Sequence, residues 1–495
     1  MQAVLSFIVI AVSGVVASQA SDFFRITVVD EQTARGVPLV ELRTVNGIKL
    51  YTDSAGVVAF HEPGLMGKDV FFHVSSHGYE FPKDGFGIRG KMLKVKAGGA
   101  TTLKIKRLNI AERLYRITGG GIYRDSVLVG AKAPLKEPVL NGLVVGSDSV
   151  MNAVYRGKIH WFWGDTNRPS YPLGNFHVPG ATSLLPGKGG LDPDVGVNLD
   201  YFVDARGFAK ETMRFPGKGP TWMTTLVPLA DDGNRERLHA SYVKVQPPLT
   251  IYARGLAVWD DDKKGFKPVA GVDMKAPIFP MGHAFRYGDH VYFAHPFPVT
   301  RVRASAKAFL DIKQYEAFTC LKEGSRLDEL QFDRDVKARL RYAWRKNAPA
   351  LDPQKEAKLI AGGKIKADEA RWQLRDAAGK RVTPHAGSVY WNEYRKRWIL
   401  IATQIGGTSL LGEIWYAEAE APVGPWDRGV KIVTHDRYSF YNPKQHPMFA
   451  KGRYLYFEGT YTHTFSGNPH ATPRYDYNQI MYRLDLSDSR LRPSD

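Results

Sequence analysis

Cysteine and long apolar runs are nearly missing from this chain. One cysteine, Cys320, occurs in 495 residues, which excludes internal disulfide bonds and zinc sites built on cysteine. Cys320 lies in a strand-like segment, so we expect a buried and unreactive thiol. After residue 20 no apolar run reaches the ~18 residues that a membrane-spanning helix needs, so we expect no stable membrane span.

A short apolar run occupies residues 4–17. It is followed by Ser18-Gln19-Ala20, a small-x-small pattern that is typical of a signal-peptide cleavage site. The sequence therefore predicts a signal peptide over residues 1–20 and a secreted or periplasmic mature protein.

Acidic residues are outnumbered by basic ones. The chain has 68 Lys and Arg residues against 50 Asp and Glu residues, which gives a formal net charge of +18. A basic surface either serves solubility alone or attracts polyanions. Because an exported protein rarely meets nucleic acid, we expect an acidic or sulfated polysaccharide or oligosaccharide as the partner, no nucleic acid, and a monomer.

Residues 22–107 alternate short apolar strands with turns that contain Gly, Pro and Asp, which predicts a small β-sandwich. Within this region, residues 28–47 and 52–63 resemble the prealbumin-like, carboxypeptidase-regulatory sandwiches of exported proteins. That resemblance implies a fold without an activity. We expect residues 108–140 to link two domains, with a short helical turn at 110–115.

Four segments of similar character recur along the rest of the chain. Each begins on a polar residue, continues into a turn with basic residues or Gly, and leads to an aromatic-rich strand, as in a β-propeller blade. A weaker fifth copy starts near residue 220. We therefore predict an all-β fold in which the sandwich precedes a five-bladed β-propeller over residues 141–488, with a helical insertion of two short helices at 345–380. The four segments are 146–150, 281–285, 384–389 and 444–449.

Carboxylates are predicted to meet in an axial pocket, because the inner strands of a propeller all begin on one face. Second strands end at that face, and third strands begin there. Such a pocket suits glycoside cleavage, in which a carboxylic acid protonates the leaving oxygen and a carboxylate activates water or attacks. Asp148 is the candidate base, Glu413 or Glu458 the candidate acid, and Asp165 a group that orients substrate or shifts a pKa. Alternatively, Asp165 and Glu458 cap turns.

Histidines, aromatic residues and polar side chains are predicted to bind substrate around the same pocket. Segments 439–444 and 465–478 have the composition of sugar sites, where rings stack on sugars and Arg binds carboxylate or sulfate. The histidines recognise an acidic sugar, plug the axis, or hold a divalent cation such as calcium; no residue is assigned as a metal ligand. The candidate substrate-binding residues are His283, His385, Gln404, Tyr441, His446, Arg474, Tyr477 and Asn478.

Three motifs, at 161–166 (WFWGDT), 417–426 (AEAEAPVGPW) and 477–484 (YNQIMYRL), resemble known propellers. Over about residues 141–488 the chain resembles the five-bladed propellers of glycoside hydrolase families 43 and 32 and, more closely, the domain of unknown function 4185. The resemblance implies glycan cleavage in an axial pocket, with an Asp at the start of the first blade as catalytic base. Asp148 matches that position.

The leading prediction is an exported glycoside hydrolase, a glycosidase that acts on an acidic or sulfated polysaccharide. Two alternatives stay open. A polysaccharide lyase would use His or Tyr as the base and Arg to neutralise a uronate carboxylate, and a non-catalytic propeller would only bind glycans.

Overall fold

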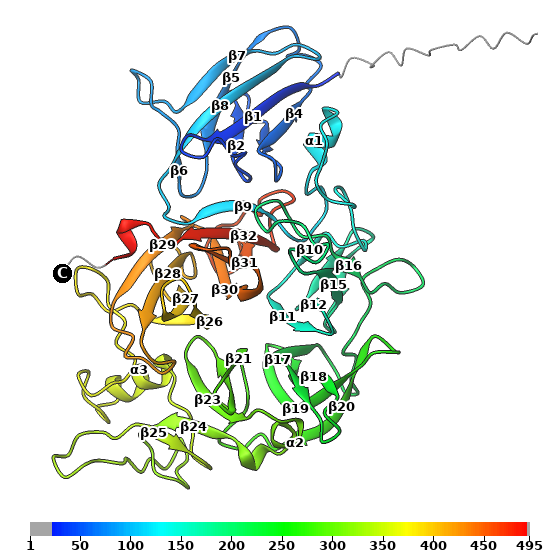
Figure 1. The fold of residues 1–495 in the computed structure, drawn as a ribbon. Helices are drawn as coiled ribbons and strands as arrows, with labels where there is room; N and C mark the ends of the chain where they lie inside the picture. The colour runs from blue at the N-terminus through cyan, green and yellow to red at the C-terminus, as the bar shows by residue number, and fades with distance from the viewer. Residues whose placement is uncertain (1–21, 493–495) are drawn as a thin grey trace, which may run out of the picture.

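The computed structural model describes residues 22–492, which form a β-sandwich and a five-bladed β-propeller (Figure 1). The predicted signal peptide, residues 1–20, lies outside the described residues. The all-β fold with a sandwich followed by a propeller, predicted from the sequence, is confirmed. No helix within residues 22–492 is long and apolar enough to cross a membrane.

The sandwich consists of two four-stranded sheets, ordered β4-β1-β8-β6 and β3-β2-β5-β7. Along β1 every second residue is buried, as expected of a strand that covers a core with one face. Apolar side chains from both sheets, such as Val28 on β1 and Phe72 on β5, fill the space between them. The strands are β1 (Phe24–Asp30), β2 (Glu41–Thr44), β3 (Lys49–Tyr51), β4 (Val57–Phe60), β5 (Asp69–Ser75), β6 (Tyr79–Glu80), β7 (Gly90–Lys94) and β8 (Ala100–Arg107).

Five antiparallel sheets surround a common centre, with β11, β17, β21, β26 and β30 as the inner strands (Figure 1). Neighbouring inner strands contact each other around the ring, and β30 returns to β11. A small sheet, β10-β13-β14, accompanies the first blade. The first three blades are β11 (Val150–Tyr155), β12 (Lys158–Trp163), β15 (Gly180–Leu184), β16 (Asp200–Tyr201); β17 (Thr221–Ala230), β18 (Glu236–Gln246), β19 (Thr250–Asp260), β20 (Gly265–Val272); and β21 (His283–Tyr287), β22 (His290–Ala294), β23 (Pro298–Arg303), β24 (Glu316–Thr319), β25 (Ala343–Arg345).

The last two blades complete the ring. The small sheet beside the first blade consists of β10, which precedes the β11–β12 hairpin, and of β13 and β14, which follow it. The remaining strands are β26 (Pro384–Asn392), β27 (Arg397–Gln404), β28 (Glu413–Ala419), β29 (Gly429–Thr434); β30 (Ser439–Gln445), β31 (Tyr454–Thr462), β32 (Asn478–Asp485), β9 (Glu112–Arg116); and, in the small sheet, β10 (Gly146–Ser147), β13 (Thr166–Arg168), β14 (Tyr171–Asn175).

The fifth blade is completed by β9, which comes from the segment that precedes the propeller. The helical turn expected at 110–115 is wrong, because Glu112–Arg116 pairs antiparallel with β32 as the outermost strand of that blade. Every residue of β9 is buried. An extended strand can bury side chains on both of its faces in this position, whereas a surface helical turn could not. The pairing joins the two ends of the propeller and closes the ring.

The insertion between the third and fourth blades contains one helix, α3 (Pro353–Ala361), where two were expected. The second helix expected at 366–374 is absent, since the amides of Arg371 and Trp372 donate to the Glu356 carboxylate at 3.0 Å instead of to preceding carbonyl groups. The other helices are α1 (Arg124–Leu128), α2 (Ala306–Leu310) and the 3₁₀ helices η1 (Ile312–Gln314), η2 (Pro447–Phe449) and η3 (Ser489–Leu491).

Cys320, which follows β24, is a free and fully buried thiol, and the expected burial is confirmed. Burial raises the pKa of this thiol to about 11, so the thiolate does not form near neutral pH.

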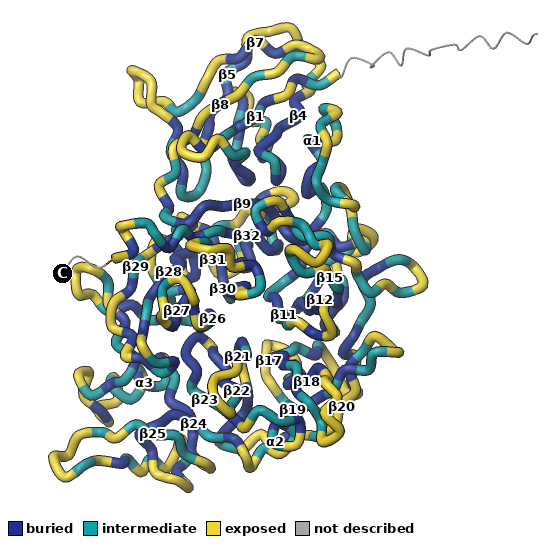
Figure 2. Tube along the Cα trace, in the orientation of Figure 1, coloured by how far each residue is buried: buried dark blue, intermediate teal, exposed yellow. Residues whose placement is uncertain are grey.

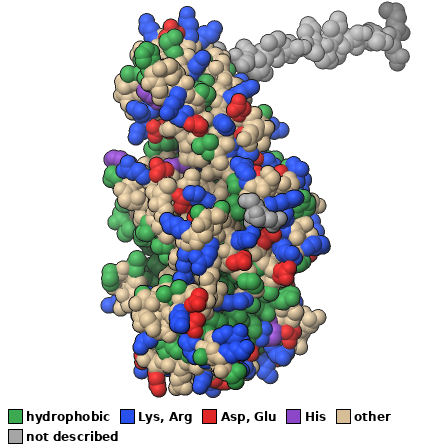
Figure 3. All heavy atoms as spheres, turned by 90° about the vertical axis from the view of Figure 1, so that its left-hand side faces the viewer, with side chains coloured by type: hydrophobic (Ala, Val, Ile, Leu, Met, Phe, Trp, Pro, Cys, Tyr) green, Lys and Arg blue, Asp and Glu red, His purple; other side chains and the backbone are tan. Residues whose placement is uncertain are grey.

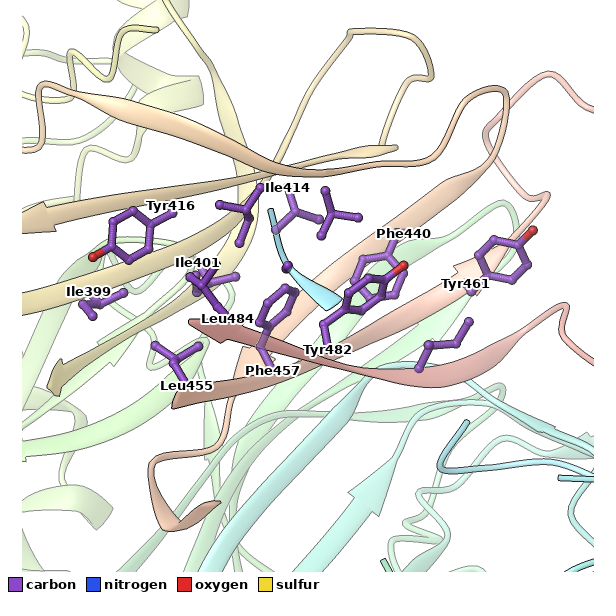
Figure 4. Packing of buried hydrophobic residues seen from close by; sticks show 14 of the residues in the cluster. Ile399, Ile401, Ile414, Tyr416, Phe440, Leu455, Phe457, Tyr461, Tyr482 and Leu484 are labelled. Atoms are coloured by element: carbon purple, nitrogen blue, oxygen red, sulfur yellow. The ribbon is translucent and has the colours of Figure 1, made fainter. Parts of the chain in front are cut away.

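The blade strands hold most of the buried residues, and the exposed residues lie on loops and outer turns (Figure 2). One apolar cluster joins the fourth and fifth blades (Figure 4). Within it the rings of Phe457 and Tyr482 stack with their centroids 5.6 Å apart, and Phe440 meets Tyr482 edge to face. This cluster holds the fourth blade against the fifth, the blade in which β9 closes the ring.

Truncation of Phe457 is expected to destabilise the protein strongly. Phe457 is fully buried in this cluster, so Phe457→Ala leaves a cavity and should lower the free energy of unfolding by about 3–5 kcal/mol. The matched control is Phe86→Ala, because Phe86 is 93% exposed and should change the value by less than about 0.5 kcal/mol. Urea unfolding of both variants measures the difference, and equal losses would contradict the packing described.

Buried polar contacts fix the sandwich to the fifth blade. The Tyr475 hydroxyl donates to the Thr52 carbonyl at 2.6 Å, and Arg113 Nε donates to the Pro38 carbonyl at 3.0 Å. Arg113 lies on β9 and is almost fully buried. Leaving such a group without its partners costs about 1–3 kcal/mol, so these contacts hold the two parts in one orientation.

Candidate active site

A cavity of about 240 Å³ lies where the inner strands meet. Its wall is formed by residues at or just before the starts of β11, β17, β21 and β26, by residues at or just after the ends of β12 and β22, and by one residue of β30. Apolar side chains predominate and a few polar groups converge, which is the composition of a ligand site. The lining residues are Asp148, Ser149, Val150, Met151, Phe162, Trp163, Gly164, Trp222, Met223, Thr224, Met281, Gly282, His283, His295, Ala386, Gly387 and Asn442.

Two carboxylates, Asp148 and Asp165, stand opposite each other: Asp148 lines the cavity, and Asp165 adjoins the lining residues Gly164 and Trp222. The Asp148 amide donates to the Asp165 carbonyl at 2.9 Å, one step from the antiparallel pair Ser147 and Thr166. Residues directly opposed on antiparallel strands direct their side chains to the same face. The structure therefore brings Asp148 and Asp165 together, as the strand start and the second-strand end of the first blade.

Hydrogen-bond donors surround the Asp148 carboxylate. Oδ1 accepts from Ser149 N at 2.5 Å and Ser149 Oγ at 2.7 Å, and from Thr460 Oγ1 at 3.4 Å. Oδ2 accepts from the Tyr477 hydroxyl at 3.2 Å. Tyr441 lies beside the same group: burial, and then the charge of Asp148, raise the pKa of its phenol well above the usual value. These donors hold a carboxylate in a single orientation.

The Asp165 carboxyl group has a raised pKa. Burial raises the pKa of Asp165 to about 7, and the negative charge of Asp148 acts in the same direction. A hydrogen bond from Trp222 Nε1 to Oδ1 at 2.9 Å opposes the shift. Asp165 is consequently a carboxylic acid below about pH 7, which is the property that a general acid needs.

Three residues of this site were not predicted as functional: Trp222, Thr460 and Asn442. Trp222 could have been found as an aromatic residue at the start of an inner strand. Asn442 has a φ of 51° at an irregularity in the pairing of β30 with β31, and its Nδ2 donates to Ser149 Oγ at 2.6 Å. Thr460 carries no sequence signal of its own, because its role depends on the register of β31.

Neutral imidazole groups lie at and beside the cavity. His283 and His295 line it, and His385 directly precedes two residues of the wall. Burial lowers the pKa of all three, and for His283 the nearby charge of Lys444 adds to the effect. His295 shows this shift although its ring surface is exposed to the cavity, because protein surrounds it on its other sides. The Nδ1 atoms of His283 and His385 are buried without a protein partner in the described chain.

His446 and Glu458 meet each other, but they lie deeper than predicted. β30 ends at Gln445, so His446 stands at the exit of an inner strand and not at its start, and the 3₁₀ helix η2 follows where a strand was expected. Glu458 lies in the middle of β31 and is fully buried, with Oε1 3.1 Å from His446 Nε2 but without hydrogen-bond alignment. Neither residue lines the cavity.

Glu413 and Gln404 belong to the fourth blade and do not line the cavity. The Glu413 carboxylate accepts a hydrogen bond from Thr434 Oγ1 at 2.8 Å and pairs with Lys431 Nζ at 3.0 Å. Although burial opposes it, these partners lower the pKa of Glu413. Gln404 Oε1 accepts from Trp415 Nε1 at 2.7 Å. Both side chains stabilise the blade, so the structure does not bring the candidate acid Glu413 to the site.

Arg474 and Asn478 also lie away from the cavity. Arg474 is at the junction with the sandwich, with Nη1 3.4 Å from Asp125 Oδ2. Asn478 is fully buried, donates from Nδ2 to the Val145 carbonyl and accepts from Thr118 Oγ1 at 2.9 Å. Its amide is engaged in holding β32 to neighbouring segments and is not available to a ligand.

No three His, Cys, Asp or Glu side chains of residues 22–492 are grouped so that they could hold a metal ion. The axial divalent cation considered from the sequence therefore has no ligand set in this part of the chain.

Comparison with solved structures finds distant similarities, among them to family-43 glycoside hydrolases. A candidate hydrolase from Bacteroides ovatus has 13% identity and a TM-score of 0.42, over 69% of this chain and 86% of that one. An exo-β-1,3-galactanase from Phanerochaete chrysosporium has 11% identity and a TM-score of 0.36, over 69% of this chain and 61% of that one. A GH43_1 enzyme from Xanthomonas citri has 11% identity and a TM-score of 0.35, over 72% of this chain and 95% of that one. No protein-family model and no curated protein matches the sequence.

TM-scores of this size do not assign an activity. The function is therefore inferred from the side chains at the cavity.

Proposed function

We propose that this protein is an exported glycoside hydrolase in which Asp165 is the general acid and Asp148 the catalytic base. The observation that carries the proposal is the opposed pair of carboxylates, Asp148 in the cavity wall and Asp165 next to that wall: donors hold Asp148, and the pKa of Asp165 is raised to about 7. Hydrolysis of a glycosidic bond requires two carboxyl groups in these two states. Export remains a prediction from residues 1–20.

In the proposed reaction the Asp165 carboxylic acid gives its proton to the glycosidic oxygen while the bond from that oxygen to the anomeric carbon breaks. The Asp148 carboxylate accepts a proton from a water molecule, whose oxygen bonds to the anomeric carbon. One water is consumed for each bond cleaved. Exchange with solvent then returns a proton to Asp165 and removes one from Asp148.

The sugar at the cleavage position is proposed to be uncharged. Within residues 22–492 no Lys or Arg lines the cavity, so an anionic ring placed there would face Asp148 and Asp165 without a compensating cation. Trp222 and Met223 offer apolar surface to a sugar ring, and His283 offers a neutral polar group. The expected acidic or sulfated polysaccharide would then present its anionic groups elsewhere on the protein.

The Asp165→Asn variant tests the proposal. It should lose about 10²–10⁴-fold in kcat/KM on ordinary glycosidic linkages, because it cannot protonate the leaving oxygen. It should keep most activity on dinitrophenyl glycosides, whose leaving group needs no proton. In the unmodified enzyme kcat/KM should fall as the pH rises past about 7, where Asp165 loses its proton, and this alkaline limb should vanish in the variant.

The assay is the release of reducing ends from a panel of neutral and acidic oligosaccharides, with ultraviolet absorbance recorded for unsaturated uronate. Asp261→Asn is the control, since Asp261 is also half-buried but pairs with Arg156 at 3.0 Å away from the cavity. An equal loss on both kinds of substrate would contradict the role of Asp165. Unsaturated products would indicate the lyase, although Arg474, the arginine expected for it, is not at the cavity.

A further inference from the structure

A second cavity, of about 230 Å³, lies at the junction between sandwich and propeller. Its wall on the sandwich side includes Lys49 and His61, both exposed. The opposite wall is formed by Arg116 at the end of β9, by Arg124 on α1, and by Arg474 before β32. Segments far apart in the sequence therefore bring several cationic groups to one enclosed space.

Arg124 and Arg474 lie close to Gly121. A Cβ atom placed on Gly121 would lie 3.5 Å from Arg124 Cβ and 3.2 Å from Arg474 Cδ. Their side chains are 40% and 46% exposed. Both contact Asp125 through Nη1, at 3.3 and 3.4 Å, and no other side-chain donor of either arginine has a protein partner in the described chain. The two guanidinium groups thus retain free donors at the rim of the cavity.

Arg116 forms the inner wall and is almost fully buried. Nη2 donates to the Gly120 carbonyl at 2.8 Å, and Nη1 donates to the Arg474 carbonyl. Its Nε has no protein partner among residues 22–492. A buried guanidinium with an unused donor is costly, and an acceptor atom supplied by a ligand would remove that cost.

Three acidic residues line the cavity; Glu62 has no side-chain partner among residues 22–492, whereas Asp53 and Asp125 are engaged by protein donors. Asp53 accepts from the amides of Ala55, Val57 and Ser126, the last at 2.7 Å. Asp125 accepts from the Ala59 amide at 3.1 Å and is shared by the two arginines. Four Lys and Arg side chains therefore face three carboxylates, and backbone amides neutralise two of these carboxylates in part, so an excess of positive charge at the cavity is open to a ligand.

We propose that this cavity binds an anionic sugar group, a uronate carboxylate or a sulfate ester, of an acidic oligosaccharide. Guanidinium groups pair with the planar or branched oxygens of such anions through several charge-assisted hydrogen bonds. The site is distinct from the Asp148–Asp165 cavity and does not depend on the hydrolase function. On the face seen in Figure 3, Lys and Arg side chains are spread over both the sandwich and the propeller. At the junction cavity, by contrast, several of them line one space.

Calorimetric titration of the full chain with trigalacturonate, and with its uncharged methyl ester, tests the proposal. The acid should bind and the ester should not. Arg124→Ala combined with Arg474→Ala should weaken binding of the acid by about tenfold or more, because both carry charge-assisted donors. Arg214→Ala is the control, since Arg214 is 73% exposed and pairs with Glu211 elsewhere; it should change binding by less than about twofold.

Arg124→Glu alone serves as a second variant, since its exposed side chain can be reversed in charge without disturbing the buried Arg116. Asp148→Asn should bind trigalacturonate as the unmodified protein does, which separates this site from the catalytic one. Equal binding of acid and ester, no binding of either, or unchanged affinity in the double and charge-reversed variants would overturn the proposal. Galactose 6-sulfate against galactose distinguishes sulfate from carboxylate recognition.

Discussion

Replacement of Asp148 by asparagine is expected to lower kcat/KM by about 10²–10⁴-fold on every substrate that the protein hydrolyses. The amide has the shape of the carboxylate, but it cannot accept a proton from the attacking water. Ser149 would still donate to Oδ1, and the amide nitrogen in place of Oδ2 would donate to the Tyr477 hydroxyl, so the side chain should keep its place. The loss should therefore appear in kcat, with KM changed only a few-fold.

The same substitution has an electrostatic consequence for Asp165. The charge of Asp148 contributes to the raised pKa of Asp165, so Asp148→Asn should lower that pKa and move the alkaline limb of the residual activity to lower pH. Burial, which is the larger cause, would remain. Asp261→Asn should leave both kcat and the limb unchanged. An Asp148→Asn variant within tenfold of full activity would exclude Asp148 as the base.

The sequence predicts the blades because the strands of one blade are neighbours along the chain. The aromatic strand at 159–163 follows the strand before it through a short turn, and the same pattern returns in every blade, so the periodicity is readable from neighbours alone. The closing strand β9 is different, since its partner β32 lies at the far end of the chain. No local pattern distinguishes such a strand from a helical turn.

For the same reason, the part of the candidate site that lies within one hairpin could be predicted from the sequence. Asp148 and Asp165 belong to one hairpin, so counting along two adjacent strands suffices to oppose them. The fifth blade misleads because Asn442-Pro443 has the composition of a turn but forms an irregularity inside β30. The inner strand therefore begins earlier than expected, which brings Tyr441 to Asp148 and moves His446 and Glu458 into the interior.

Asp165 and Glu458 are both carboxyl groups whose pKa is raised by burial, but they differ in their surroundings. Asp165 is half-buried next to the cavity wall, bonded to Trp222, and is proposed to give its proton to a substrate. Glu458 is fully buried, and neither of its oxygens has a hydrogen-bond partner in the described part of the chain. We therefore expect a substitution of Glu458 to change the stability of the protein and not its catalytic activity.

Glu458→Gln is expected to remove a pH dependence of stability. Burial raises the pKa of Glu458 to about 8, partly offset by Lys444, from an ordinary value of 4.5. Between these values the folded protein holds a proton that the unfolded chain has lost, so stability falls as the pH rises, by up to about 1.4 kcal/mol per pH unit. Glutamine does not titrate, and the variant should be more stable than the unmodified protein near pH 8, by about 2–4 kcal/mol, with little difference near pH 4.

Glu413→Gln provides a control of opposite sign. Glu413 is as buried as Glu458, but its threonine donors and Lys431 lower its pKa, so its charged form stabilises the fold above the ordinary pKa of a glutamate. Neutralising it should therefore destabilise the protein at neutral pH, and the loss should shrink as the pH falls through the pKa of Glu413. Urea unfolding at acidic and alkaline pH measures both variants. If Glu458→Gln instead destabilised the protein at alkaline pH and less so at acidic pH, as expected for Glu413→Gln, Glu458 would be charged in the folded state and the expectation would be wrong.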